Sequence, residues 1–143
     1  MIFQFFKISK KEKRLFISAY YYCFIARASL FFVKNERYLK RIGTYMKTPD
    51  EKSQNFNTNT IAEVRLAIKR VTKYAFWNNN CLPQAIGAKR LLKKQGITST
   101  LYLGVKKNND HSSLEAHAWL ESGGIDVVGG QNKAGFSVVG RFS

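Results

Sequence analysis

Two residues of this chain could together carry out nucleophilic chemistry. Cys81 lies in the segment WNNNCLPQAIGAKRLLKKQG, whose apolar spacing predicts a helix that begins at this cysteine and stops at Gly96. A thiol at a helix N-terminus lies in the positive end of the helix dipole, which favours the thiolate. His117 lies in LEAHAWLESGGIDVVGG, within a predicted short strand, where an imidazole can serve as ion-pair partner and proton carrier. The pair therefore indicates acyl transfer through a cysteine, with N–H groups of the helix start facing the oxyanion.

Each of these residues also has a purely structural interpretation. A cysteine can be an inert buried side chain, and a single histidine on a strand is commonly a core residue held by hydrogen bonds. The apolar neighbours of His117 predict a partly dry strand, which favours a functional histidine. His111 lies in a polar loop among Asn, Asp and Ser, so we expect it to be solvated.

A third group should orient the imidazole by accepting a hydrogen bond from its other ring nitrogen. Asp126 follows His117 by nine residues, and a Gly-Gly pair between them predicts a hairpin. If the turn is centred on residues 122–123, Asp126 faces Trp119 and lies on the same side as His117. A one-residue slip would turn it away. A backbone carbonyl could replace it, and two carboxylates on the His117 strand are further alternatives: Glu115 and Glu121.

The sequence contains no metal-ligand cluster, phosphate loop or dinucleotide fingerprint, so we expect no metal and no cofactor. Cys23 and Cys81 are 58 positions apart and form neither a disulfide framework nor a zinc-ligand pair. That cysteine usage is typical of a reducing compartment, and we expect a cytoplasmic protein.

The composition indicates one globular domain with an unusually basic surface. The chain has 143 residues, of which 45% are hydrophobic, which excludes wholesale disorder. Its formal net charge of +15 could serve a nucleic acid, an anionic membrane or an acidic protein partner. Because the basic residues are spread along the chain, an ordinary solvated surface explains the charge equally well.

Helices are predicted in the first half of the chain. Ser9 and Glu12 fit a capping box at the start of a long helix, and residues 35–42 predict a shorter one that ends at Gly43. The apolar run 15–33 superficially resembles a membrane anchor, but Arg27 and several tyrosines lie within it. We therefore expect a core or partner-facing helix in which Cys23 is a small buried residue.

A polar loop and a third helix are expected next. Residues 47–60 are rich in turn formers, and either Thr58 or Thr60 could cap the helix that follows. This helix carries an apolar stripe at three- and four-residue steps, which is typical of core packing: Ile61, Val64, Ile68, Val71 and Ala75.

The second half places strands after the helix that starts at Cys81. Lys89 of that helix is expected off its apolar face. Extended segments follow over residues 98–105, 114–121, 125–128 and 134–142. Helices followed by an antiparallel sheet define the α+β class.

The run WNNNCLPQAIGAKRLLKKQGITSTLYLGV, followed by AHAWLESGGIDVVGG and FSVVGRF, resembles the transglutaminase-like leader peptidases of lasso-peptide biosynthesis. The resemblance is specific over residues 77–142 and looser over the N-terminal helices. It implies a papain-like cysteine peptidase with the chain order Cys, His, Asp. Cys81 then matches the nucleophile and His117 the AHAW histidine. Some relatives place the acid a few residues beyond Asp126, where this chain has Gly129 and Gly130.

The resemblance also implies partners and a domain layout. The substrate would be a ribosomal precursor peptide, and the partners would be a separate leader-recognition protein and an ATP-dependent macrolactam cyclase. Within a single domain, residues 1–46 would form a helical docking or core region, 47–60 a loop and 61–143 the transglutaminase-like catalytic core.

The sequence is also compatible with two other functions. An acyltransferase on the same fold would use an amine in place of water. A non-catalytic basic module would bind nucleic acid or an anionic membrane. The Cys and His motifs favour the peptidase and disfavour nucleic acid, while peripheral contact with a membrane stays open.

Overall fold

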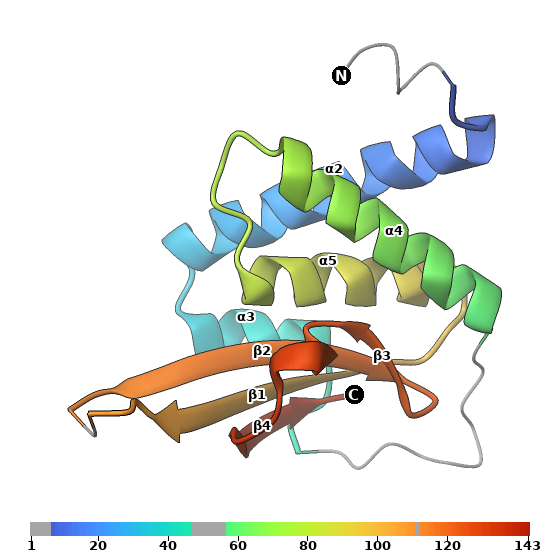
Figure 1. Cartoon of the computed structure of the whole chain (residues 1–143). Helices are drawn as coiled ribbons and strands as arrows, with labels where there is room; N and C mark the ends of the chain where they lie inside the picture. The colour runs from blue at the N-terminus through green and yellow to red at the C-terminus, as the bar shows by residue number, and fades with distance from the viewer. Residues whose placement is uncertain (1–6, 47–56, 111) are drawn as a thin grey trace.

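The computed structural model describes residues 7–46, 57–110 and 112–143, and it has the expected α+β architecture. Within these ranges four helices precede a four-stranded antiparallel sheet, and the helices lie together on one side of the sheet (Figure 1). His111 and residues 47–56 of the expected loop lie outside the described residues.

Helix α2 (Lys10–Phe32) begins where the sequence predicts. The Glu12 N–H donates to the Ser9 hydroxyl at 3.2 Å, and the Ser9 N–H donates to the Glu12 carboxylate at 3.0 Å. This reciprocal pair satisfies two N–H groups that the first helical turn leaves free. Among the described residues, α2 is the one helix long and apolar enough to cross a membrane by length and composition.

The face that α2 turns toward the other helices consists of small side chains. Ala19, Cys23 and Ala26 are fully buried at steps of four and three residues, and α2 packs against α4 and α5. The expected burial of Cys23 is confirmed. Large apolar side chains of α2 lie outward instead, with Tyr21 and Phe31 exposed.

Helices α3 (Asn35–Ile42) and α4 (Thr58–Tyr74) follow the expected positions. One prediction about α4 is wrong, because its N-cap is Asn57 and not Thr58 or Thr60. The Asn57 side-chain oxygen accepts from the Thr60 N–H at 3.1 Å. Asparagine caps a helix at least as well as threonine, so the cap falls one residue earlier.

Helix α5 (Cys81–Lys94) begins at the candidate nucleophile and ends with Gly96 in the left-handed region at φ 72°. The Ile97 N–H donates to the Leu92 carbonyl at 2.9 Å, which closes the helix in the manner of a Schellman motif. The placement of Lys89 off the apolar face is wrong, because its side chain is buried and its ammonium donates to the Ser99 carbonyl.

The sheet has the strand order β3-β2-β1-β4. The first and last strands are shorter or displaced relative to the prediction: β1 covers Thr100–Lys107 and β4 covers Ser137–Phe142. Residues before β4 form a turn instead, in which the Phe136 N–H donates to the Lys133 carbonyl at 3.2 Å.

Strands β2 (Leu114–Ser122) and β3 (Ile125–Val128) form the predicted hairpin through Gly123 and Gly124, at φ 56° and 75°. Both glycines have the positive φ that a tight two-residue hairpin turn requires. The turn is centred one residue later than expected, so Asp126 pairs with Glu121 and not with Trp119. Moving the turn by one residue along the chain shifts the pairing of the strands by two residues. Asp126 therefore stays on the expected face of the sheet.

The two faces of β2 have different surroundings. Ala118 and Leu120 belong to the core that the sheet shares with the helices. By strand alternation, His117, Trp119 and Glu121 lie on the other face. The Trp119 ring stacks there on Tyr102 of β1, with ring centroids 5.5 Å apart.

Candidate active site

The backbone of the first turn of α5 surrounds Cys81 with groups that can receive negative charge. Cys81 is half-buried and follows Asn80, whose side chain forms no capping hydrogen bond. The first intrahelical bond joins the Gln84 N–H to the Asn80 carbonyl at 3.2 Å, so the N–H groups of Cys81 and Leu82 precede the helical ladder. Donors of this kind can stabilise a thiolate or an oxyanion beside the sulfur.

Two amide side chains fix the segment that leads into Cys81. Asn79 is buried, and its amide N–H donates to the Thr72 hydroxyl of α4 at 3.2 Å. The Gln84 amide donates to the Asn79 carbonyl at 2.6 Å. The start of α5 is therefore tied to α4 through one residue and to its own first turn through another.

Aromatic packing supports the same segment from α2. The Trp77 ring meets Tyr20 edge-on with centroids 4.7 Å apart and Phe24 with centroids 5.3 Å apart. Such tilted contacts hold large rings in defined positions. The chain therefore approaches Cys81 along the surface of α2.

His117 lies on β2 opposite Gly104 of β1. A side chain at Gly104 would crowd the Trp119 ring at 2.8 Å and Phe136 at 3.0 Å, so the glycine leaves room for both rings. The imidazole of His117 lies near both rings, with centroid distances of 5.3 Å to Phe136 and 6.0 Å to Trp119. It is half-buried in these aromatic surroundings.

The acceptor for His117 in the structure is a backbone carbonyl. Its Nε2 lies 2.8 Å from the Gly129 carbonyl oxygen. Because a carbonyl can only accept, Nε2 carries the proton, and the lone pair of the neutral ring is on Nδ1. Nδ1 is thus the ring atom that could exchange a proton with a thiol. Among the described residues, no hydrogen bond joins Cys81 to His117: α5 packs against β2 on the face of Ala118 and Leu120, and His117 lies on the other face of the strand.

The Asp126 carboxylate binds Lys133 and not His117. Lys133 Nζ lies 2.7 Å from Asp126 Oδ1 and 2.8 Å from Glu121 Oε1, and these bonds raise the pKa of Lys133. Glu115, the other carboxylate considered, pairs with Lys106 at 3.4 Å. Each candidate carboxylate therefore has a lysine partner.

Two glycines and an arginine shape the turn that presents the Gly129 carbonyl. Gly129 has φ 77°, and a β-carbon there would approach the Ala118 carbonyl at 2.7 Å. A β-carbon on Gly130 would overlap the Asp126 carboxylate. Arg65 of α4 donates to the carbonyls of Val127, at 3.3 Å, and of Asp126.

The sequence did not predict that Lys133, Arg65 and the Gly129 carbonyl belong to this site. The available signal was the Gly129–Gly130 pair itself, because adjacent glycines after a strand often mark a close backbone approach. In the described ranges, no group of three or more His, Cys, Asp or Glu side chains could hold a metal ion.

A helix that begins at a cysteine and packs on an antiparallel sheet bearing a histidine is a framework for cysteine-dependent acyl transfer. Comparison with protein families agrees with this class, since residues 27–141 match the model of the Transglutaminase-like superfamily. The chain belongs to this superfamily. No curated protein and no solved structure matches the chain.

Proposed function

We propose that the protein is a cysteine peptidase that removes the leader from a ribosomally made lasso-peptide precursor before macrolactam closure. The observation that carries the proposal is the position of Cys81 at the start of α5, together with a His117 ring whose Nε2 is held by the Gly129 carbonyl. The transglutaminase-like family supports cysteine chemistry, and the Cys81 and His117 motifs support the narrower substrate assignment.

In the proposed mechanism, Cys81 and His117 come within hydrogen-bond reach in the complex with substrate. His117 Nδ1 then takes the proton of Cys81, and the thiolate attacks the carbonyl carbon at the leader–core junction. The N–H groups of Cys81 and Leu82 stabilise the oxyanion. The tetrahedral intermediate collapses, the C–N bond breaks, and His117 gives its proton to the departing amine. Water then loses a proton to His117 and attacks the thioester, which releases the leader carboxylate and regenerates the thiol. The amine released is the N-terminus that a cyclase would use.

Partners and location are part of the same proposal. A separate leader-recognition protein would deliver the precursor, and an ATP-dependent cyclase would consume the product in the cytoplasm. The outward aromatic face of α2, which includes Tyr21 and Phe31, is a candidate docking face for one of these proteins. The same exposed face could instead contact the surface of a membrane.

The decisive experiment incubates the purified chain with its precursor peptide and recognition protein, followed by intact mass spectrometry. We expect two products whose masses add to the precursor plus one water, and we expect Cys81→Ala to abolish them. Folding of the variant is checked by circular dichroism, since Cys81 also packs against the core. Products that carry an added amine in place of water would favour an acyltransferase. No turnover by a folded chain that binds the precursor would favour a non-catalytic module.

A further inference from the structure

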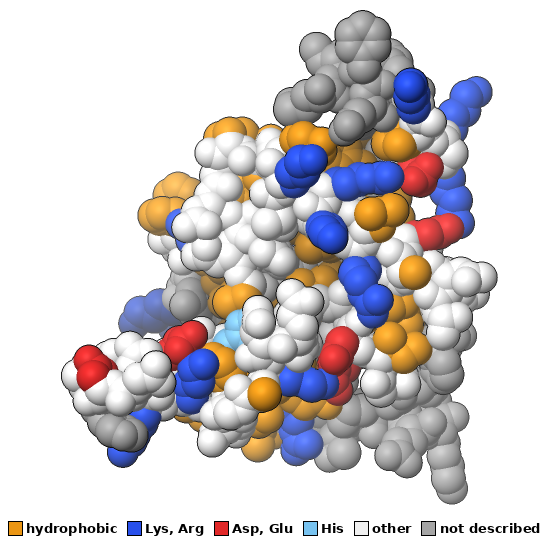
Figure 2. All heavy atoms as spheres, viewed as in Figure 1, with side chains coloured by type: hydrophobic (Ala, Val, Ile, Leu, Met, Phe, Trp, Pro, Cys, Tyr) orange, Lys and Arg blue, Asp and Glu red, His pale blue; other side chains and the backbone are white. Residues whose placement is uncertain are grey.

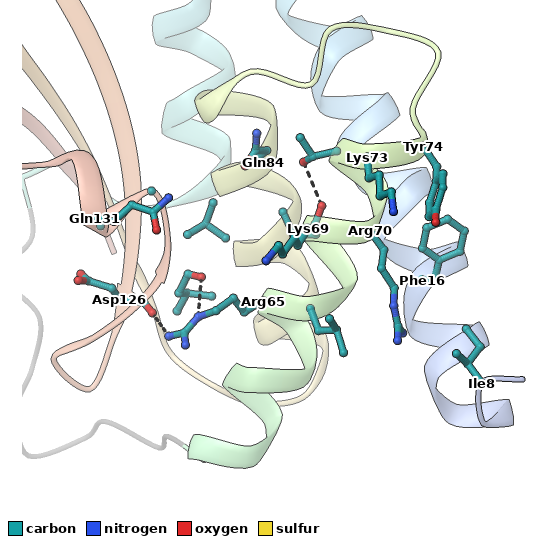
Figure 3. A pocket seen from close by; sticks show the side chains of 17 residues that line it. Ile8, Phe16, Arg65, Lys69, Arg70, Lys73, Tyr74, Gln84, Asp126 and Gln131 are labelled. Carbon is teal, nitrogen blue, oxygen red and sulfur yellow. Dashed lines mark hydrogen bonds between the residues drawn. The ribbon is translucent and has the colours of Figure 1, made fainter. Parts of the chain in front are cut away.

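A groove runs between α4 and the turn that joins β3 to the 3-10 helix η2 (Gly130–Asn132). Figure 3 shows Arg65 and Lys69 projecting from α4 toward the wall that carries Asp126 and Gln131, whereas Lys73, one turn further along α4, points toward Tyr74. The hollow, which also extends around α4 toward α2, has a volume of about 1370 Å³. We call the part between α4 and the β3–η2 turn the α4 groove.

One uncommitted charge, that of Lys69, projects into the α4 groove, and a second, that of Lys73, lies on the next turn of α4. Arg65 is bound to backbone carbonyls of β3. Lys69 and Lys73 are exposed, and within the described residues neither has a carboxylate partner; the Lys73 ammonium lies 5.2 Å from the centre of the Tyr74 ring. The one carboxylate of the opposite wall, Asp126, is paired with Lys133. Figure 2 shows Lys and Arg side chains gathered over the helices on the same side of the molecule.

The groove also reaches the backbone beside both candidate catalytic residues. Gln84, which lines it, lies in the first turn of α5 that begins at Cys81, and its amide holds the Asn79 carbonyl. Gly129, which also lines it, holds Nε2 of His117 through its carbonyl. A chain lying in the groove therefore has one end beside the proposed site of cleavage.

We propose that the α4 groove binds an acidic segment of the peptide substrate in an extended conformation, an inference that rests on the proposed peptidase function. Lys69 and Lys73 are four residues apart on a helix, which separates them by about 6 Å along its axis. Alternate side chains on one side of an extended peptide are about 7 Å apart. Two acidic residues with one residue between them would therefore each meet one lysine.

The groove's other polar groups suit a peptide. The amide side chains of Gln84 and Gln131 offer both donors and acceptors at its walls, as an extended backbone requires. A nucleic acid would instead call for more cations along its phosphates, whereas Arg65 is already committed to backbone carbonyls.

The test measures binding by the full chain carrying Cys81→Ser, so that it does not depend on turnover. The probe is a fluorescein-labelled peptide with a Glu-Gly-Glu segment, beside its Gln-Gly-Gln counterpart, followed by fluorescence anisotropy. Reversal of both charges in Lys69→Glu/Lys73→Glu should weaken binding of the acidic peptide about tenfold, as expected for two solvent-exposed ion pairs. A Lys-Gly-Lys peptide should bind the reversed variant better than the parent.

The matched control is Lys94→Glu/Lys107→Glu, which makes the same charge change at two exposed lysines outside the groove. Its effect should stay below about twofold. Equal weakening by both double variants would overturn the proposal in favour of general attraction to the +15 chain. A short single-stranded oligonucleotide is tested in the same way. If it binds more tightly than the acidic peptide, and Lys69→Glu/Lys73→Glu abolishes its binding, the groove is a nucleic-acid site and the proposal is overturned.

Turnover separates this inference from the function on which it rests. If the precursor is cleaved and Lys69→Glu/Lys73→Glu leaves kcat/KM unchanged, the groove proposal fails while the peptidase stands. If the acidic peptide binds as expected but no precursor is cleaved, the peptidase proposal fails and the groove is an acidic-peptide site.

Discussion

At the scale of single residues, the site places a backbone oxygen where cysteine peptidases commonly place a side-chain acceptor. The Gly129 carbonyl holds His117 Nε2, and Asp126 acts on the turn that carries this carbonyl. Its carboxylate packs on Gly130 and accepts from Lys133. Asp126 is therefore a positioning residue in this arrangement, because it reaches the imidazole only through the turn.

This arrangement predicts that Asp126→Asn is mild. The asparagine side-chain oxygen still accepts a hydrogen bond from Lys133, so the turn and the Gly129 carbonyl stay in place. We expect kcat/KM for precursor cleavage to fall less than about threefold, whereas a true triad acid typically costs about 10⁴-fold on this substitution. Lys133→Met, which leaves the carboxylates of Asp126 and Glu121 without their shared cation, should cost about tenfold or more.

The readout that distinguishes positioning from direct action is the pH profile of kcat/KM. In Asp126→Asn, kcat/KM should fall on the acidic side of the profile at the same pH as in the unsubstituted protein, because the Gly129 carbonyl still orients His117. A fall at a different pH, together with activity as low as that of His117→Ala, would show that the carboxylate charge itself acts on the imidazole.

The residue scale also shows what the sequence could and could not predict. Alternation along two strands correctly put Asp126 on the face of His117, because that depends only on parity. The exact pairing of β2 with β3 could not be predicted in the same way. Leu120 pairs with Val128 and Glu121 pairs with Asp126, so Val127 has no partner and forms an irregularity in β3. The carbonyl acceptor had no side-chain signal, because every residue has a carbonyl.

At the scale of elements, the close approach of α2 and α5 positions Cys81. Small side chains on both helices form the contact, and Gly87 of α5 lies directly against Cys23 of α2. Hydrophobic periodicity could not identify this face, because α2 is apolar nearly all round. The fully buried residues of α2 are all small, which lets the helix axes come together.

Gly87→Ala should therefore destabilise the fold even though alanine is the better helix former. The added β-carbon would lie 2.5 Å from Cys23 Sγ and 3.3 Å from the Cys23 backbone nitrogen, so the two helices must separate. We expect the free energy of unfolding, measured by urea titration, to fall by about 1 to 3 kcal/mol, as is usual for overpacking.

A double-mutant cycle with Cys23→Ala tests the contact itself. Removal of Sγ makes room for the new β-carbon, so Cys23→Ala/Gly87→Ala should lose less stability than the two single variants summed. Strict additivity would mean that the loss comes from the backbone of α5 and not from its contact with α2.

At the scale of the whole molecule, the basic composition extends into the core. Of the many lysines, Lys89 is 5% exposed, and burial lowers the pKa of its ammonium to about 8, with Lys93 adding to the effect. The sequence did not predict this burial, because a lysine in a helix is usually solvated. The polar contact that makes it tolerable is the Ser99 carbonyl before β1, which lies ten residues further along the chain.

Lys89 should make the stability of the whole chain rise in mild alkali. Below about pH 8 its ammonium is charged in both the folded and the unfolded chain, and the cost of burying the charge is fully present. Between about pH 8 and the ordinary pKa of 10.5, the unfolded chain binds more protons than the folded one, so the free energy of unfolding increases with pH. We expect a gain of about 1 to 3 kcal/mol across this window, relative to Lys89→Met, in urea titrations at constant ionic strength. Both proteins contain the same tyrosines and cysteines, so the contribution of these residues to the pH dependence of the free energy of unfolding cancels in the comparison with Lys89→Met. If both proteins show the same pH slope, the Lys89 ammonium is solvated and the core does not contain its charge.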